Sequence, residues 1–222
     1  MKNPWVAVGV VVVLLIIGSV FLSNQSAQES NESITITDHV KGNPEASVML
    51  TEYSDFQCPA CSSFQPVVES VLEQYGDQIR FEYRHFPLIT IHPHALRAAI
   101  AAEAAGQQGK FFEFHDLLFQ NQQEWSTVAV PTTFFVKYAE ELELDIEQFR
   151  SQLNSSLLEE RVRSQFDEAR ELGLTGTPSF LLNGQKMKYE TLDEFLGQIA
   201  AAIDPSSASG TAAVGSDVRF GF

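Results

Sequence analysis

The spacing of hydrophobic residues changes several times along the chain, and each change marks an expected element. Residues 47–56 form a mostly apolar stretch, which predicts a buried strand. Apolar residues then recur at helical intervals from Phe64 to Tyr75, which predicts a helix. Residues 78–88 alternate between apolar and polar and predict a second strand. Because a helix joins the two strands, we expect a right-handed βαβ unit with parallel strands.

The rest of the chain predicts a block of helices between two further β segments. Residues 33–37 alternate and predict a short edge strand ahead of the βαβ unit. From 95 to 172 the apolar spacing is helical, and we interpret the aromatic stripes in this region as core packing. Beyond it, the pair Asn183-Gly184 separates two runs at 180–182 and 185–189, which is typical of a β-hairpin.

An apolar run without any charge, from Trp5 to Leu22, predicts a membrane anchor. As a helix, a run of this length spans about 27 Å, close to the thickness of a bilayer core. A cleaved signal peptide is the alternative, but its apolar region is shorter, and the best cleavage site here, residues 25–27, is poor. Lys2 precedes the run and residues 23–40 contain no Lys or Arg, so we expect the remainder of the chain on the extracytoplasmic side.

Cys58 and Cys61 are the only cysteines, and they stand at C-x-x-C spacing where the first strand gives way to the helix. The N–H groups of a first helical turn lack internal partners, and the helix dipole adds about half a positive charge there. We therefore expect the pKa of Cys58 to fall below the ~8.5 of a free cysteine. Pro59 suits the first helical position because its missing N–H would have been unpaired anyway. The pattern predicts a redox-active pair, with Cys58 open to other thiols and Cys61 buried behind it.

Two other uses of a C-x-x-C pair were weighed. A structural zinc site needs two more ligands, and no second cysteine pair exists, which leaves only histidines to complete it: His85, His92, His94 and His115. We interpret His85 as a partly buried strand residue and the pair at 92 and 94 as surface loop residues. A purely structural disulfide across a two-residue gap would constrain little loop entropy.

Composition limits the class of partner. The chain carries 29 acidic and 14 basic residues, for a net charge of −15. Nucleic acid and anionic lipid surfaces repel such a charge, so we expect no nucleic-acid partner. The hydrophobic content of 44% is ample for one core.

Four stretches of the sequence resemble the DsbA-type thiol:disulfide oxidoreductases, and they are residues 52–61, 83–88, 109–112 and 176–180. The resemblance covers about residues 38–203. It implies an α/β fold, namely a thioredoxin-like fold with an inserted α-helical domain. The expected organisation is a cytoplasmic tip at 1–4, an anchor at 5–22, a tether at 23–33, the first part of the thioredoxin-like domain at 34–94, the helical insertion at 95–172, its second part at 173–204 and a disordered tail at 205–222.

The resemblance also implies roles for residues around the two cysteines. In that family the proline that matches Pro178 is cis and packs beside the redox disulfide, and the backbone of its neighbour, Thr177 here, binds the substrate chain. Glu52 lies where thioredoxin-like proteins carry a buried acid, and we assign it to proton transfer with Cys61. The alternative for Glu52 is an edge-facing glutamate in a half-exposed strand.

Two residues of the site blur the direction of exchange. Ala60 stands where strongly oxidising members often carry a histidine, which removes one cationic stabiliser of the thiolate. Thr177 before the proline also occurs in isomerase-like relatives. Pro59 and Ala60, which lie between the two cysteines, are expected to support the site without taking part in the exchange.

The resemblance implies a membrane-anchored oxidase that introduces disulfides into reduced, unfolded exported proteins. It also implies reoxidation by a quinone-linked membrane oxidoreductase. We expect a monomer with no cofactor and no metal. A disulfide isomerase or reductase with the same active site is the first alternative, and a non-catalytic module that holds peptide or metal is the second.

Overall fold

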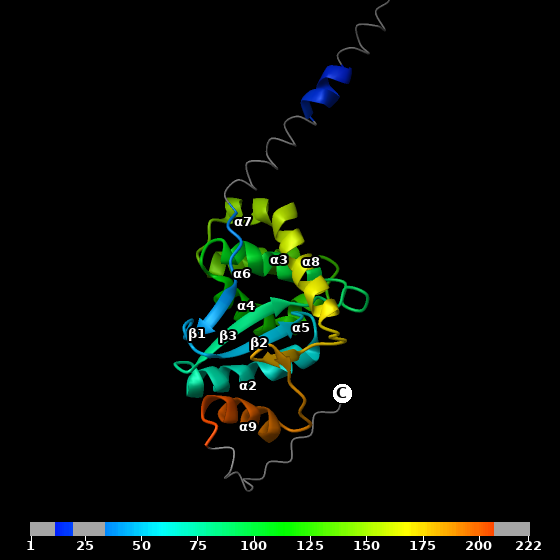
Figure 1. The fold of residues 1–222 in the computed structure, drawn as a ribbon. Helices are drawn as coiled ribbons and strands as arrows, with labels where there is room; N and C mark the ends of the chain where they lie inside the picture. The colour runs from blue at the N-terminus through cyan, green and yellow to red at the C-terminus, as the bar shows by residue number, and fades with distance from the viewer. Residues whose placement is uncertain (1–11, 20–33, 207–222) are drawn as a thin grey trace, which may run out of the picture.

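The computed structural model describes residues 12–19, which are helical, and residues 34–206. Its centre is one mixed five-stranded sheet in the order β1-β3-β2-β4-β5 (Figure 1). The strands are β1 (His39–Gly42), β2 (Val48–Ser54), β3 (Ile79–His85), β4 (Ser179–Leu182) and β5 (Gln185–Lys186).

The central strand is β2, which pairs in parallel with β3 and antiparallel with β4. Neighbours on both sides explain why the sequence of β2 is apolar with little alternation: nearly all of its residues are buried. Helix α2 (Pro59–Tyr75) links β2 to β3. The parallel β2–α2–β3 unit expected from the sequence is therefore confirmed, and so is the α/β fold class.

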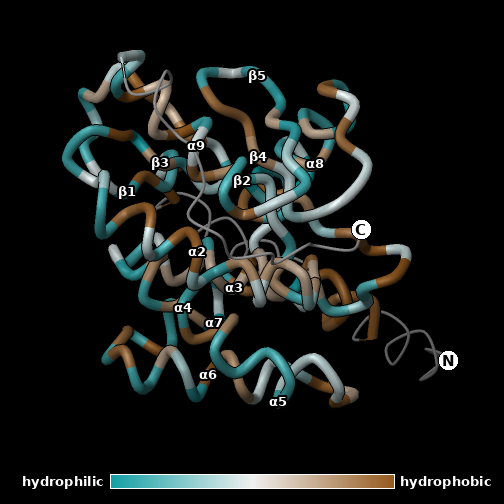
Figure 2. Tube along the Cα trace, turned by 90° about the horizontal axis from the view of Figure 1, so that it is seen from below, coloured by the Kyte–Doolittle hydropathy of each residue, from teal (hydrophilic) through white to brown (hydrophobic). Residues whose placement is uncertain are grey.

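Helices cover both faces of the sheet. Helix α2 and the last helix, α9 (Leu192–Ile203), lie on one face, and α3 and α8 lie on the other (Figure 1). Between β3 and β4 the chain is helical, with α3 (Ala95–Gly106), α4 (Phe111–Gln120), α5 (Gln122–Ser126), α6 (Thr132–Glu141), α7 (Ile146–Gln152) and α8 (Ser156–Glu171). In a view turned by 90°, α5, α6 and α7 lie at the opposite side of the molecule from β5 (Figure 2).

Side chains of the central strands pack on both faces of the sheet. Phe180 of β4 packs against Phe64 of α2 and Phe195 of α9. Tyr53 of β2 belongs to a separate buried cluster that includes Ala169 of α8. Because side chains of a strand alternate between faces, the residue before Tyr53 points toward α2 and its cysteines.

The first strand differs from its expected position. Residues 34–37, the part of this stretch that the structure describes, lie outside the sheet, and β1 follows at His39–Gly42, antiparallel to β3. The apolar alternation was misleading because the residue of β1 that is most buried is polar: His39 is 7% exposed and stacks on Phe111.

The hairpin after Pro178 is also shorter than expected. Its second strand was predicted over 185–189, but β5 contains only Gln185 and Lys186. One further bond joins Met187 N to Phe180 O at 2.9 Å. Beyond it the chain leaves the sheet, because Tyr189 packs on Phe195 of α9.

The membrane prediction falls mostly outside the described residues. The expected tip at 1–4 and tether at 23–33 lie wholly outside them, as does most of the tail at 205–222, and only residues 12–19 of the expected anchor are described. Within the described residues, no helix has the length and apolar character needed to cross a bilayer.

Candidate active site

The link from β2 to α2 places Cys58 at the mouth of a helix. Cys58 is the N-cap residue of α2, with extended backbone angles (φ −73°, ψ 121°), and Pro59 occupies the first turn. The N–H of Cys58 donates to Asp55 O at 3.0 Å, and its carbonyl accepts from Ser62 N at 3.2 Å. The turn and the helix thus hold the backbone of Cys58 from both sides.

Both cysteines carry free thiols in this structure. Cys61, one turn into α2, is 1% exposed, and Cys58 is 8% exposed. Cys61 is the more buried of the two, as expected, but Cys58, which was expected to be open to other thiols, is itself buried. Part of the cover comes from Thr177, whose carbonyl oxygen lies 3.5 Å from Cys58 Sγ.

Hydrogen bonds lower the pKa of Cys58 to about 5. The largest contribution is the bond from the Cys61 thiol, and burial opposes it. The Thr177 hydroxyl and the N–H groups of Cys61 and Ala60 lower the pKa further. The main-chain donors belong to the first turn of α2, whose N–H groups have no partners within the helix.

The pKa of Cys61 moves in the opposite direction. Burial raises it well above its usual value, and the neighbouring Cys58 and Glu52 raise it further because each disfavours a second negative charge. The two thiols therefore differ in chemistry: Cys58 is ionised at neutral pH and Cys61 holds its proton.

Glu52 lies on β2 and is 2% exposed, so the alternative of a half-exposed edge residue is wrong. Burial raises the pKa of Glu52 to about 7, and the nearby Ser54 hydroxyl offsets a smaller part. Among the residues that the structure describes, none gives a hydrogen bond to Glu52 Oε2. A carboxyl group that titrates near neutral pH and influences Cys61 is suited to proton transfer.

The peptide bond between Thr177 and Pro178 is cis, as the resemblance implies. Both residues are buried, and they line a hollow that extends from Thr175 over the β4–β5 hairpin to Glu194. Two segments that are far apart in the sequence therefore meet at Cys58. On the other side of the sulfur, Pro59 and Ala60 are exposed on the first turn of α2.

Asp55, a buried carboxylate three residues before Cys58, is a further residue of the site that the sequence pattern did not single out. It accepts bonds from Gln57 N at 2.7 Å, from Leu88 N at 2.9 Å and from His92 Nδ1 at 2.7 Å. The interpretation of His92 as a surface residue is therefore wrong, because its side chain is 16% exposed and pairs with a buried acid. The spacing of Asp55 from the cysteines was visible in the sequence, but its partners were not.

Three of the four histidines considered as metal ligands, His85, His92 and His115, each contact one carboxylate. His85 Nε2 lies 3.1 Å from Glu103 Oε1, and His115 Nδ1 lies 2.7 Å from Asp116 Oδ1. Across the described part of the chain, no three side chains of His, Cys, Asp or Glu gather in a way that would hold a metal ion.

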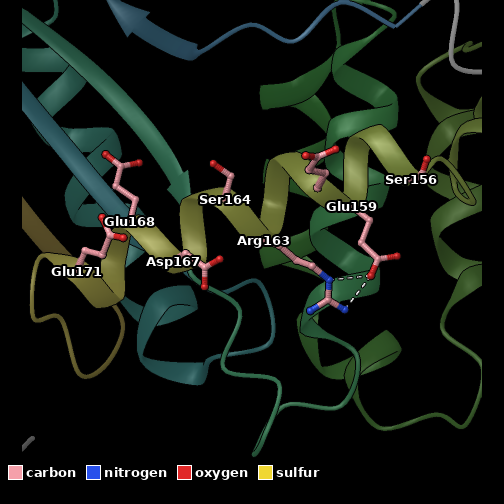
Figure 3. A pocket seen from close by; sticks show the side chains of 8 residues that line it. Ser156, Glu159, Arg163, Ser164, Asp167, Glu168 and Glu171 are labelled. Carbon is pink, nitrogen blue, oxygen red and sulfur yellow. Dashed lines mark hydrogen bonds and ion pairs between the residues drawn. The ribbon is translucent and has the colours of Figure 1, made fainter.

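A second hollow lies along α8, away from the thiols (Figure 3). It is lined by one helix face, on which Arg163 binds Glu159 one turn earlier at 2.7 Å. An i,i+4 ion pair of this kind is a common feature of a solvated helix. We therefore assign the chemistry to Cys58 and not to this face.

Comparison with known proteins places the chain in a family. A family model described as thioredoxin matches residues 34–201. The chain belongs to the thioredoxin family. Curated relatives that share sequence with this chain include the Na(+)/H(+) antiporter NhaA 3 of Salinispora tropica, 41% identical over 149 residues, and the Na(+)/H(+) antiporter NhaA 1 of Mycobacterium sp. (strain KMS), 38% identical over 155 residues. These matches cover 67% and 68% of this chain but only 22% and 24% of the antiporters.

Solved structures agree on the fold of this thioredoxin family member. A thioredoxin-like oxidoreductase from Silicibacter pomeroyi is 26% identical, with a TM-score of 0.63 over 78% of this chain and 96% of its own. The α-DsbA1 protein of Wolbachia pipientis has a TM-score of 0.67 at 24% identity and covers 81% and 98%. BdbD from Bacillus subtilis has a TM-score of 0.66 at 21% identity and covers 75% and 92%. The DsbA-type, thioredoxin-like fold is thereby confirmed.

Proposed function

We propose that this chain is an extracytoplasmic thiol:disulfide oxidase that introduces disulfide bonds into exported proteins. Family membership and the DsbA-type fold support thiol–disulfide exchange as its chemistry. The single observation that carries the direction of exchange is the pKa of Cys58, which is about 5. A thiolate that is stable at neutral pH is a good leaving group, which favours the reduced form of the pair.

The reaction starts from the disulfide between Cys58 and Cys61. A substrate thiolate attacks Cys58 Sγ, the internal disulfide breaks, and Cys61 leaves and takes a proton, for which the buried carboxyl group of Glu52 is the proposed donor. A second substrate thiolate then attacks the substrate sulfur of the mixed disulfide. Cys58 leaves as a thiolate. Two electrons have passed from the substrate dithiol to the Cys58–Cys61 pair, and the substrate has gained one disulfide.

The size of the thiolate effect can be given to order of magnitude. At pH 7, a pKa of about 5 stabilises the reduced form by about 2.7 kcal/mol. For a two-electron couple this makes the disulfide more oxidising by about 60 mV. Ala60 supplies no positive charge to stabilise the thiolate, so it does not add to this oxidising effect.

The hollow beside the cis peptide bond is the proposed place of the substrate chain. It adjoins Thr177 and Pro178, and the Thr177 carbonyl lies 3.5 Å from Cys58 Sγ. An extended segment bound there would bring its own cysteine toward the reacting sulfur. The site needs no cofactor for this exchange, because both electrons move between sulfur atoms.

The remaining parts of the proposal concern location and partners. The apolar run at 5–22 is proposed as an anchor in the membrane, with the thioredoxin-like domain outside. The proposed domain limits are 34–94, 95–172 and 173–204, and the protein is proposed to act as a monomer. We propose that a quinone-linked membrane oxidoreductase restores the disulfide after each turnover.

The test is the recovery of activity by reduced, unfolded ribonuclease when the oxidised protein is added. The wild-type chain should accelerate recovery, whereas Cys58→Ser and Cys61→Ser, neither of which can form the internal disulfide, should not. Equal recovery with wild type and Cys58→Ser would contradict the proposal. A reduction potential near that of thioredoxin, about −270 mV, would instead assign the same site to a reductase.

A further inference from the structure

The segment that carries Cys58 is held by two glutamine side chains. Gln122 lies on α5, is 7% exposed and reaches two carbonyl oxygens with its Nε2 atom: Phe56 O at 2.8 Å and Cys58 O at 2.9 Å. Gln57 binds in the opposite sense, because its Nε2 donates to Ser126 O on α5 at 3.2 Å. Helix α5 and the residues 56–58 are thus joined by three hydrogen bonds.

The chemistry of these bonds selects an amide with two donors. The NH₂ group of Gln122 carries two hydrogens, and each is directed to a carbonyl that cannot donate. An apolar side chain of the same length would leave two main-chain acceptors without this donor in a buried place. A carboxylate would face two carbonyl oxygens with a negative charge. The position is therefore specific for a neutral double donor.

The position of the Cys58 backbone decides how its sulfur meets the helix. The carbonyl of Cys58 is bound by Ser62 N at 3.2 Å from within α2 and by Gln122 from outside it. The N–H groups of Ala60 and Cys61, in the first turn of α2, lower the pKa of the thiol of the same residue. Rotation of the Cys58 peptide group would break the bond from Gln122 and would also shift the sulfur relative to the N–H groups of Ala60 and Cys61.

We propose that Gln122 is a positioning residue that fixes the main chain of Cys58, so that its sulfur stays aligned with the first-turn N–H groups of α2 during exchange. The inference deepens the proposed function and rests on it, since it concerns the same sulfur. It assigns a task to α5, which lies 64 residues from Cys58 in the sequence.

The test compares Gln122→Met with Gln123→Met in the full chain. Methionine keeps the length of the side chain and removes both donors, and Gln123 is an exposed neighbour on the same helix. Weakening one hydrogen bond to a thiolate corresponds to about one pKa unit. Gln122→Met should therefore raise the pKa of Cys58 from about 5 to about 6, and slow its alkylation by iodoacetamide at pH 5 about fivefold. Gln123→Met should match the wild type.

Circular dichroism and thermal unfolding confirm that each variant is folded. A folded Gln122→Met protein whose Cys58 titrates as in the wild type would overturn the inference, even if the variant were less stable. Should Gln122→Met fail to fold, Gln122→Asn, whose amide is too short to reach both carbonyls, must show the same direction of shift. The alkylation assay needs no substrate protein, so a wild type that fails to oxidise ribonuclease would refute the proposed function without affecting this result.

Discussion

At the scale of single residues, the site consists of three acidic groups whose pKa values are driven apart by hydrogen bonds at Cys58 and by burial at Glu52 and Cys61. The pKa of Cys58 is about 5, that of Glu52 is about 7, and that of Cys61 lies well above its usual value. The pKa of Cys58 is low because hydrogen-bond donors of α2 and of neighbouring side chains favour its thiolate. The pKa values of Glu52 and Cys61 are raised because both groups are buried. The same sheet-to-helix junction therefore holds a stabilised thiolate, a carboxyl group that titrates near neutral pH and a thiol that keeps its proton.

Glu52→Gln should make the protein more stable and less active. Burial raises the pKa of Glu52 from 4.5 to about 7, so its neutral form contributes stability below pH 4.5 that is lost as the pH rises through 7. The free energy of unfolding of the variant should exceed that of the wild type by about 3 kcal/mol at pH 8 and should equal it at pH 4, as measured by urea unfolding. Disulfide exchange should slow by about tenfold or more, because Cys61 loses its proton carrier.

The matched control for this prediction is Glu69→Gln, which removes the same charge from an exposed position of α2. It should change neither stability nor exchange rate. A Glu52→Gln protein with wild-type stability at pH 8 would show that Glu52 is ionised without cost in the folded protein, which contradicts the proposed proton transfer.

At the scale of elements, one buried glutamate joins the sheet to the inserted helices. Glu103 of α3 is 1% exposed and lies 3.0 Å from His39 of β1 and 3.1 Å from His85 of β3. Arg161 of α8 is 3.9 Å away. Contacts with the two histidines lower the pKa of Glu103 to about 2 although burial opposes them. Four elements thus depend on one carboxylate.

Glu103→Ala should destabilise the protein by about 3–5 kcal/mol at pH 7, because it leaves buried polar partners unpaired. Since the pKa of Glu103 is lowered, its contribution is present above pH 4.5 and is lost as the pH falls toward 2. The pKa of buried His85 is also lowered, which weakens the folded state on the acid side in the same way. Urea unfolding at pH 7 and pH 3 measures both effects.

Glu113→Ala on α4 serves as the control, since its partner Lys110 forms an exposed pair that is worth less than about 1 kcal/mol. The role of Glu103 as a paired, buried carboxylate would be contradicted if Glu103→Ala lost no more unfolding free energy than the control. It would also be contradicted if the loss stayed constant down to pH 3.

The elements differ in how far the sequence predicts them. The parallel β2–α2–β3 unit and the hairpin turn have local signals, namely apolar spacing and the pair Asn183-Gly184, and both are present. Strand β1 was misplaced because His39 is buried through Glu103, a partner 64 positions later in the sequence. A polar residue that is buried by a distant ion pair gives no apolar pattern to read.

At the scale of the whole molecule, the site is assembled from three distant segments. Thr177 lies 119 positions after Cys58, and Gln122 lies 64 positions after it. Spacing alone predicted the cysteines at a helix start, and the family resemblance added Thr177 and Pro178. Neither source could indicate Gln122 or Asp55, because the partners of both are main-chain atoms or loop residues that only the fold brings together.

The molecule as a whole is acidic, with a net charge of −15, yet the reacting sulfur must be ionised within it. A negative surface by itself disfavours a further anion. The low pKa of Cys58 therefore has to come from local donors, and the Cys61 thiol, the Thr177 hydroxyl and the first-turn N–H groups of α2 supply them.

The most direct test of this account is the titration of Cys58 in the reduced full chain, followed by the rate of alkylation between pH 3 and pH 10. The account predicts a single midpoint near pH 5 that disappears in Cys58→Ser, with Cys61 unreactive over the neutral range. A midpoint near the ~8.5 of an ordinary cysteine would contradict it, since no stabilised thiolate would then be present to drive exchange toward oxidation.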